Sequence, residues 1–167
     1  MKSSILISSI VSVDENRGIG KENKIPWNIP KDRKWFKEKT LGHVVIMGKN
    51  TFLSILDFLG KPLPGRINIV VTDVPIDAHE NTHFVASIED ALDLGRKLEK
   101  KGEIFFVGGA QIYKTSLRFV KRLYITLVKQ KFNCDTFFPD YSDFKKEIFS
   151  KEDSDNGFDV EFKVLER

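Results

Sequence analysis

The chain has 167 residues, of which 41% are hydrophobic and 31% charged. This is the composition of a globular protein and excludes a disordered or fibrous one. Its 27 basic and 24 acidic residues leave a net charge of +3, which does not indicate a nucleic-acid partner and is compatible with a small anionic ligand.

A single cysteine, Cys134, excludes an intrachain disulfide and is typical of a reducing compartment. The apolar N-terminal stretch lacks a signal-peptide pattern, and nothing approaches the roughly 18 apolar residues of a membrane span. We therefore expect one soluble cytoplasmic domain over residues 1–167.

Apolar, β-branched runs bounded by glycine, proline or charged residues predict buried strands. In chain order, the expected strands are residues 4–13, 43–47, 67–72, 83–86, 103–107, 122–128 and 158–165. The last two alternate more strongly, as antiparallel or edge strands do. Helical patterns between the strands cover residues 30–39, 49–58, 87–101 and 110–120.

The alternation of strand and helix predicts an α/β fold in a single domain. We expect a mostly parallel central sheet with an antiparallel C-terminal edge and helices on both faces. Ligands of such sheets bind beyond the carboxyl ends of the strands, which directs attention to the loops 14–28, 48–51, 72–75 and 108–111. The first loop is unusually long and predicts a lid or binding loop.

Several kinds of chemistry find no support in the sequence. The three histidines, His43, His79 and His83, have no partner at metal-ligand spacing, so we expect no metal site. No serine or cysteine lies in a nucleophile-elbow motif, and the first strand lacks the glycine pattern of a Rossmann fold or P-loop.

Two turns that each join a predicted strand to a predicted helix are rich in glycine. Residues 107–111 are Val-Gly-Gly-Ala-Gln, and residues 48–51 are Gly-Lys-Asn-Thr. Glycine lets a backbone approach a ligand closely, and amide groups at a helix N-terminus can bind a phosphate. A plain structural turn explains either motif alone, whereas the pair suits a dinucleotide with several phosphates.

Asp32 lies in the first turn of the helix predicted at 30–39, after a Pro-Trp-Asn motif at 26–28 and before Trp35. An acid at this place is ordinarily explained by the helix dipole. The alternative is a carboxylate buried beneath an aromatic ligand, with its pKa shifted by apolar surroundings. Arg66, which ends a Pro-Leu-Pro-Gly-Arg segment, is either a turn residue or a bidentate partner for a ligand carboxylate.

In their joint order and spacing, these segments resemble the dihydrofolate reductase family over nearly the whole chain. The matching segments are residues 18–20, 25–28, 32, 35–36, 45–52, 62–68, 107–113, 123–126 and 135–139. The resemblance implies an enzyme that transfers a hydride from NADPH to 7,8-dihydrofolate. The product, 5,6,7,8-tetrahydrofolate, would support one-carbon and thymidylate metabolism.

The resemblance also assigns the pterin pocket. Asp32 would bind the 2-amino group and N3 of the pterin, assisted by Trp27, Thr126 and the lid residue Ile25. An Asp with the ordinary pKa of about 3.9 is a poor acid near neutrality, and it would lie at the wrong edge of the ring. We therefore expect water to deliver the proton to N5 while Asp32 polarises the pterin.

Further substrate contacts are implied in the same way. Arg66 would bind the α-carboxylate of the glutamate tail. The full set of residues expected at the substrate is Ile10, Asp32, Arg33, Phe36, Ile55, Leu59, Arg66, Val107, Tyr113 and Thr126.

For NADPH, the resemblance implies contacts from the lid, from both glycine turns and from the loop after residue 71. The expected residues are Ser12, Gly18, Ile19, Gly20, Asn23, Lys24, Gly48, Lys49, Asn50, Thr51, Val71, Thr72, Asp73, Gly108, Gly109, Ala110, Gln111 and Ile112. The family also implies a cis peptide between Gly108 and Gly109, and a contact of Asp135 with the lid near Gly20.

Two features depart from the family pattern. Arg33 replaces an apolar residue; it either turns to solvent or leans over the pocket mouth toward the glutamate carboxylates. In the second case it would disfavour antifolates with a bulky apolar group, such as trimethoprim. Asp73 and Gln111 lie where the family usually offers Ser, Thr or Arg to the 2′-phosphate, so the preference for NADPH over NADH is expected to be smaller than usual.

Two alternatives are considered. The reductase of riboflavin synthesis shares the fold and cofactor but lacks the motifs that contain Asp32 and Arg66. The second alternative is a module that binds a pterin or a nucleotide without catalysing a reaction, although none of the family motifs is interrupted in this sequence. A monomer is the family's usual state.

Overall fold

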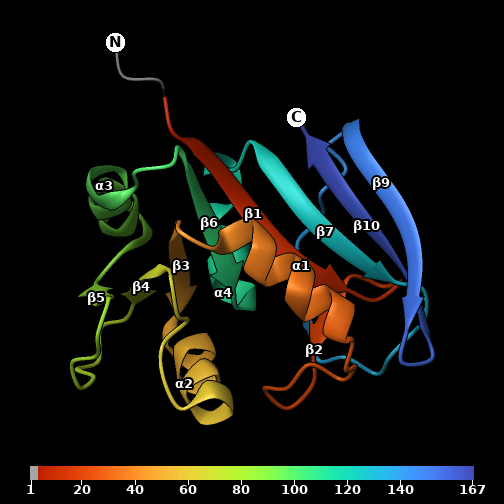
Figure 1. Cartoon of the computed structure of the whole chain (residues 1–167), viewed down its shortest axis with the longest axis horizontal. Helices are drawn as coiled ribbons and strands as arrows, with labels where there is room; N and C mark the ends of the chain where they lie inside the picture. The colour runs from red at the N-terminus through yellow and green to blue at the C-terminus, as the bar shows by residue number, and fades with distance from the viewer. Residues whose placement is uncertain (1–3) are drawn as a thin grey trace.

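The computed structural model describes residues 4–167 and contains one eight-stranded sheet (Figure 1). The strands run in the order β5-β4-β3-β6-β1-β7-β10-β9. Their bounds are Leu6–Val13 (β1), Val44–Gly48 (β3), Ile67–Val71 (β4), Thr82–Val85 (β5), Glu103–Gly108 (β6), Arg122–Val128 (β7), Lys146–Asp155 (β9) and Phe158–Glu166 (β10). A separate pair joins Gly18–Gly20 (β2) to Thr136–Phe137 (β8).

The predicted fold class is confirmed. Strands β1, β3, β4, β5, β6 and β7 pair in parallel, while β10 is antiparallel to both β7 and β9. Of the two alternatives for β7 and β10, the antiparallel one is confirmed, because the two strands pair antiparallel with each other. Neither is an edge strand, since β9 forms the edge.

The helices cover both faces, as expected. They are Pro30–Thr40 (α1), Lys49–Leu59 (α2), Ile88–Leu98 (α3) and Ala110–Ser116 (α4). Side chains of α3 and α4 pack with Val44 and Ile46 on one face, whereas those of α1 and α2 pack with Val45 and Met47 on the other. The alternation of adjacent residues along β3 produces this division.

Two helices end earlier than the sequence indicates. The pattern predicts a helix to residue 101, but Glu99 leaves the helix and its buried carboxylate accepts hydrogen bonds from the amides of Val44 and Lys101, both at 2.8 Å. The helix predicted at 110–120 tightens after Ser116 into the 3₁₀ turn Leu117–Phe119. Within residues 4–167, no helix has the length and apolar character that a membrane crossing requires.

Candidate active site

Asp32 lies where α1 crosses the carboxyl ends of β1 and β7. The Thr126 hydroxyl on β7 donates a hydrogen bond of 2.7 Å to Asp32 Oδ1. Ser12 on β1 accepts a 2.9 Å hydrogen bond from Trp27 Nε1, and it is also a hydrogen-bond partner of Asp32. The structure thus brings three predicted residues, Asp32, Thr126 and Trp27, into one polar group. It places Ser12, expected among the NADPH contacts, in that group as well.

The Asp32 carboxyl lies in a low-dielectric environment. Burial raises its pKa, while hydrogen bonds from Thr126 and Ser12 and the nearby positive charge of Arg33 act in the opposite direction. Buried Tyr113 donates a 2.8 Å hydrogen bond to the carbonyl of Ile10, and burial together with the Asp32 charge raises the pKa of its phenol. Such a carboxyl can bind an amino group and ring nitrogen of a heterocycle.

Apolar side chains surround this group. Phe36 and Ile55 pack as half-buried residues against a cluster that contains Ile10 and Val107. The other two predicted apolar residues lie outside it: Leu59 is 40% exposed and Ile25 on the lid is 61% exposed. Side chains of α1, α2 and the sheet therefore form an apolar cluster beside this group.

Arg66 is buried, with a relative exposure of 5%. Its Nε donates to the Pro64 carbonyl at 2.8 Å, and one terminal nitrogen donates to Thr40 Oγ1 at 3.3 Å. Among residues 4–167 no carboxylate lies within 4.0 Å of it, and burial lowers its pKa. A buried guanidinium with no anionic neighbour is suited to bind a ligand carboxylate.

Arg33 is exposed and donates a hydrogen bond to the side chain of Asn28, at the base of the lid. Its guanidinium is directed toward the start of α1. The orientation agrees with the first of the two sequence interpretations, a side chain turned outward.

The two glycine turns pack against each other. A Cβ built on Gly48 would lie 3.2 Å from Ile112 Cγ1, and one on Gly109 would lie 3.2 Å from Thr51 Oγ1. The peptide between Gly108 and Gly109 is cis, as expected. Neither α2 nor α4 has a side-chain cap at its start, so the first amide groups there can face the phosphates of a dinucleotide. The residues present therefore fit a dinucleotide cofactor.

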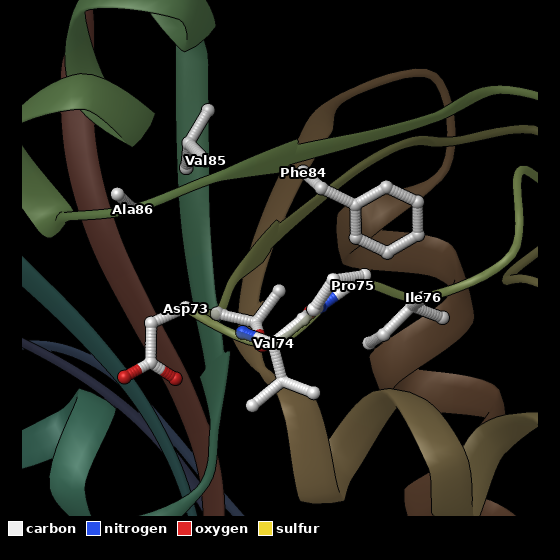
Figure 2. Close-up of a pocket in the computed structure, with 8 residues that line it drawn as sticks. Asp73, Val74, Pro75, Ile76, Phe84, Val85 and Ala86 are labelled. Atoms are coloured by element: carbon white, nitrogen blue, oxygen red, sulfur yellow. The ribbon is translucent and has the colours of Figure 1, made fainter.

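A hollow of about 470 Å³ lies at the ends of β4 and β5. Thr72, Asp73, Val74, Pro75 and Ile76 form one side of it, and Phe84, Val85 and Ala86 the other. In Figure 2 the Asp73 carboxylate and the Phe84 ring lie on opposite sides of the loop. Gln111 is exposed at the start of α4.

The lid is attached to the segment around residue 135, as the resemblance implies. The Asp135 carboxylate accepts from the Glu22 amide at 2.9 Å, and the Asp135 amide donates to the Gly20 carbonyl at 2.9 Å. Sequence reasoning missed Asp14, which is 1% exposed and accepts hydrogen bonds from the amides of Asn16, Gly18 and Phe132. An Asp directly after an apolar strand and before a polar turn is the signal that could have indicated it.

This fold and this site define a class of protein: an α/β enzyme that binds a nitrogen heterocycle over one carboxylate, beside paired turns for a dinucleotide. The comparisons name the family. Residues 6–167 match the family model described as dihydrofolate reductase. The chain is 40% identical to dihydrofolate reductase of Bacillus subtilis (strain 168) over 166 residues, which cover 97% of this chain and 95% of that protein.

Other relatives agree. The chain is 39% identical to dihydrofolate reductase type 3 of Salmonella typhimurium over 167 residues, covering 98% of this chain and 99% of the relative. A solved dihydrofolate reductase from Enterococcus faecalis, complexed with NADP(H) and RAB-propyl, superposes with a TM-score of 0.84 at 31% identity, covering 97% of this chain and 96% of that one.

The chain belongs to the dihydrofolate reductase family. It is an NADPH-dependent oxidoreductase that reduces dihydrofolate to tetrahydrofolate.

Proposed function

We propose that the chain performs this reduction at the group around Asp32. The observation that carries the proposal is the 2.7 Å hydrogen bond from Thr126 to a carboxyl whose pKa burial raises. Because Thr126 donates to one oxygen, the other oxygen can bind the 2-amino group and N3 of a pterin. Arg66 binds the α-carboxylate of the tail, since its guanidinium has no anionic neighbour among residues 4–167.

For NADPH, the proposed contacts are the amides of the two glycine turns, the ammonium of Lys49 and the hollow beside Thr72. When bound, NADPH supplies a hydride to pterin C6, and a proton from water completes the addition at N5. Asp32 polarises the ring and so raises the basicity of N5, while Phe36 and Ile55 exclude water from the reacting face.

Asp32→Asn tests the assignment. The variant keeps an oxygen that accepts from Thr126 but loses the charge, so we expect turnover near neutral pH to fall about a hundredfold, in the range typical of lost electrostatic stabilisation. The loss should be smaller at acid pH, where N5 protonates more easily. NADPH binding should be nearly unchanged, because the cofactor turns lie on other loops.

The measurement is the decay of NADPH absorbance with dihydrofolate, together with a fluorescence titration of NADPH. The exposed Asp57→Asn on α2 is the matched control. Near-wild-type rates in Asp32→Asn would contradict the assignment.

We further propose that residues 1–167 act as one cytoplasmic, monomeric domain that binds antifolates at the Asp32 site. All main strands belong to a single sheet, which supports one domain. Gel filtration tests the monomeric state. Inhibition of turnover by an antifolate tests antifolate binding.

A further inference from the structure

The first turn of α1, which contains Asp32, has no capping side chain of its own. Ile29 occupies the capping position and cannot accept a hydrogen bond through its side chain. Pro30 has no amide hydrogen, and the amides of Asp32 and Arg33 donate to the Ile29 carbonyl at 2.9 and 3.3 Å. Only the Lys31 amide is then left without an acceptor inside this turn.

A residue near the other end of the chain supplies that acceptor. The Lys31 amide donates a 2.8 Å hydrogen bond to Oδ2 of Asp155, the last residue of β9. The Lys31 ammonium adds hydrogen bonds to Asp153 Oδ1 at 2.8 Å and to the Ser154 carbonyl at 3.2 Å. Asn156, in the turn between β9 and β10, donates to the Asn28 carbonyl at 2.8 Å.

These contacts differ in strength. Lys31 is half exposed, and an exposed lysine–carboxylate pair contributes little to stability. A carboxylate on a helix N-terminal amide forms a charge-assisted hydrogen bond and also interacts favourably with the helix dipole. The bond from the Lys31 amide to Asp155, although exposed, is therefore the contact that we expect to contribute most to holding the turn.

We propose that Asp155 is a positioning residue for the reaction: by accepting the Lys31 amide, it holds the first turn of α1 so that the Asp32 carboxylate faces Thr126. Asp32 follows Lys31 directly, so a shift of this turn moves the carboxylate and any pterin bound to it. Figure 1 shows the β9–β10 turn at the end of the sheet where α1 begins. The inference rests on the proposed role of Asp32.

The test compares Asp155→Ala with Asp155→Asn. Alanine removes the acceptor, whereas the asparagine oxygen can still accept from the Lys31 amide. We expect Asp155→Ala to raise the KM for dihydrofolate about three- to tenfold, as the loss of a capping group would. The KM for NADPH should stay within about twofold, because the glycine turns do not contact the hairpin, and Asp155→Asn should restore most of the dihydrofolate affinity.

Two control variants separate the cap from its surroundings. Asp153→Ala removes the ion pair with Lys31 and the hydrogen bond that Asp153 accepts from the Ser154 amide, but leaves Asp155 in place. Glu152→Ala, also on β9, removes an exposed ion pair with Lys129. Both should keep the wild-type KM for dihydrofolate. If Asp155→Ala is too unstable to assay, Asp155→Gln, which displaces the acceptor by one methylene, replaces it in the comparison.

Hydrogen exchange of the Lys31 amide in the ligand-free protein gives a readout that does not depend on turnover. Exchange should be faster in Asp155→Ala than in Asp155→Asn. If the wild type did not reduce dihydrofolate, the proposed function would fail while this measurement still tested the cap.

Three outcomes would overturn the inference. They are equal rises in both KM values, an Asp155→Asn variant as defective as Asp155→Ala, and faster exchange of the Lys31 amide with an unchanged KM for dihydrofolate. The last outcome would leave Asp155 as a helix cap with no effect on Asp32.

Discussion

At the scale of single residues, the burial of the Asp32 carboxylate lowers the stability of the folded protein near neutral pH. In the role proposed for it, Asp32 binds a polar heterocycle with its charge held in a partly apolar environment, and that burial raises its pKa. A carboxyl with a raised folded-state pKa binds protons more tightly in the folded than in the unfolded protein. Its contribution therefore favours folding at low pH and is lost as pH rises from the ordinary carboxyl range through the folded pKa.

Asp32→Asn should consequently stabilise the protein near neutral pH. Asparagine keeps the acceptor for Thr126 without a buried charge, and we expect a gain of about 1 kcal/mol in the free energy of unfolding. This gain should decrease as pH falls from the folded-state pKa of Asp32 to the ordinary carboxyl range. Urea denaturation at several pH values measures it.

The control for this prediction is Asp57→Asn, an exposed change of the same chemistry. It should alter the free energy of unfolding by less than about 0.5 kcal/mol at any pH. A stability gain in Asp32→Asn that did not vary with pH would argue against the raised pKa as its cause.

At the scale of elements, the lid depends on a carboxylate outside the reaction. Asp14 accepts three amide hydrogen bonds, two from the lid and one from Phe132, at 2.7 to 2.9 Å. We expect Asp14→Ala to lower the free energy of unfolding by about 3 kcal/mol, because it leaves buried donors unpaired. The lid should also become more sensitive to proteolysis between β1 and α1.

Asp135→Ala is the comparison, since the Asp135 carboxylate accepts a single exposed hydrogen bond within residues 4–167, from the Glu22 amide. Its effect on unfolding should be below about 1 kcal/mol. Equal losses in the two variants would show that burial of Asp14 does not determine the stability of the lid.

The elements also differ in how far the sequence reveals them. Strands β1, β3, β4 and β6 are predictable because both of their faces are buried, which produces continuous apolar runs. Strand β9 was missed: nearly all of its residues are exposed at the sheet edge, so no apolar pattern marks it. The pair of β2 and β8 is too short to produce any pattern.

The same reasoning applies to the site. Asp32, Arg66 and both glycine turns could be predicted as site residues because they lie in local sequence motifs, which the family resemblance includes. The hydrogen bonds from Phe132 to Asp14 and from Lys31 to Asp155 could not be predicted, since each joins segments more than 100 residues apart. Propensity and spacing carry no information on such contacts, which only the sheet order creates.

At the scale of the whole molecule, the central strands should open last. Strands β3 and β6 lie between helices on both faces and contain residues with almost no exposure, whereas β9 pairs on one side only. We expect amide hydrogens of β3 and β6 to exchange only through global unfolding and those of β9 to exchange through local opening. Hydrogen exchange at increasing urea concentrations distinguishes local opening from global unfolding. Equal protection of β9 and β3 would contradict this prediction.

The contact between Lys31 and Asp155 has a consequence for biosynthesis. The two residues are separated by 124 positions, so a ribosome makes the beginning of α1 long before its acceptor. Until the last hairpin leaves the exit tunnel, the nascent chain carries the Asp32 carboxylate on a helix whose first turn lacks the Asp155 acceptor. If Asp155 positions Asp32 as proposed, productive substrate binding has to wait for the C-terminus, even where the earlier strands have already folded.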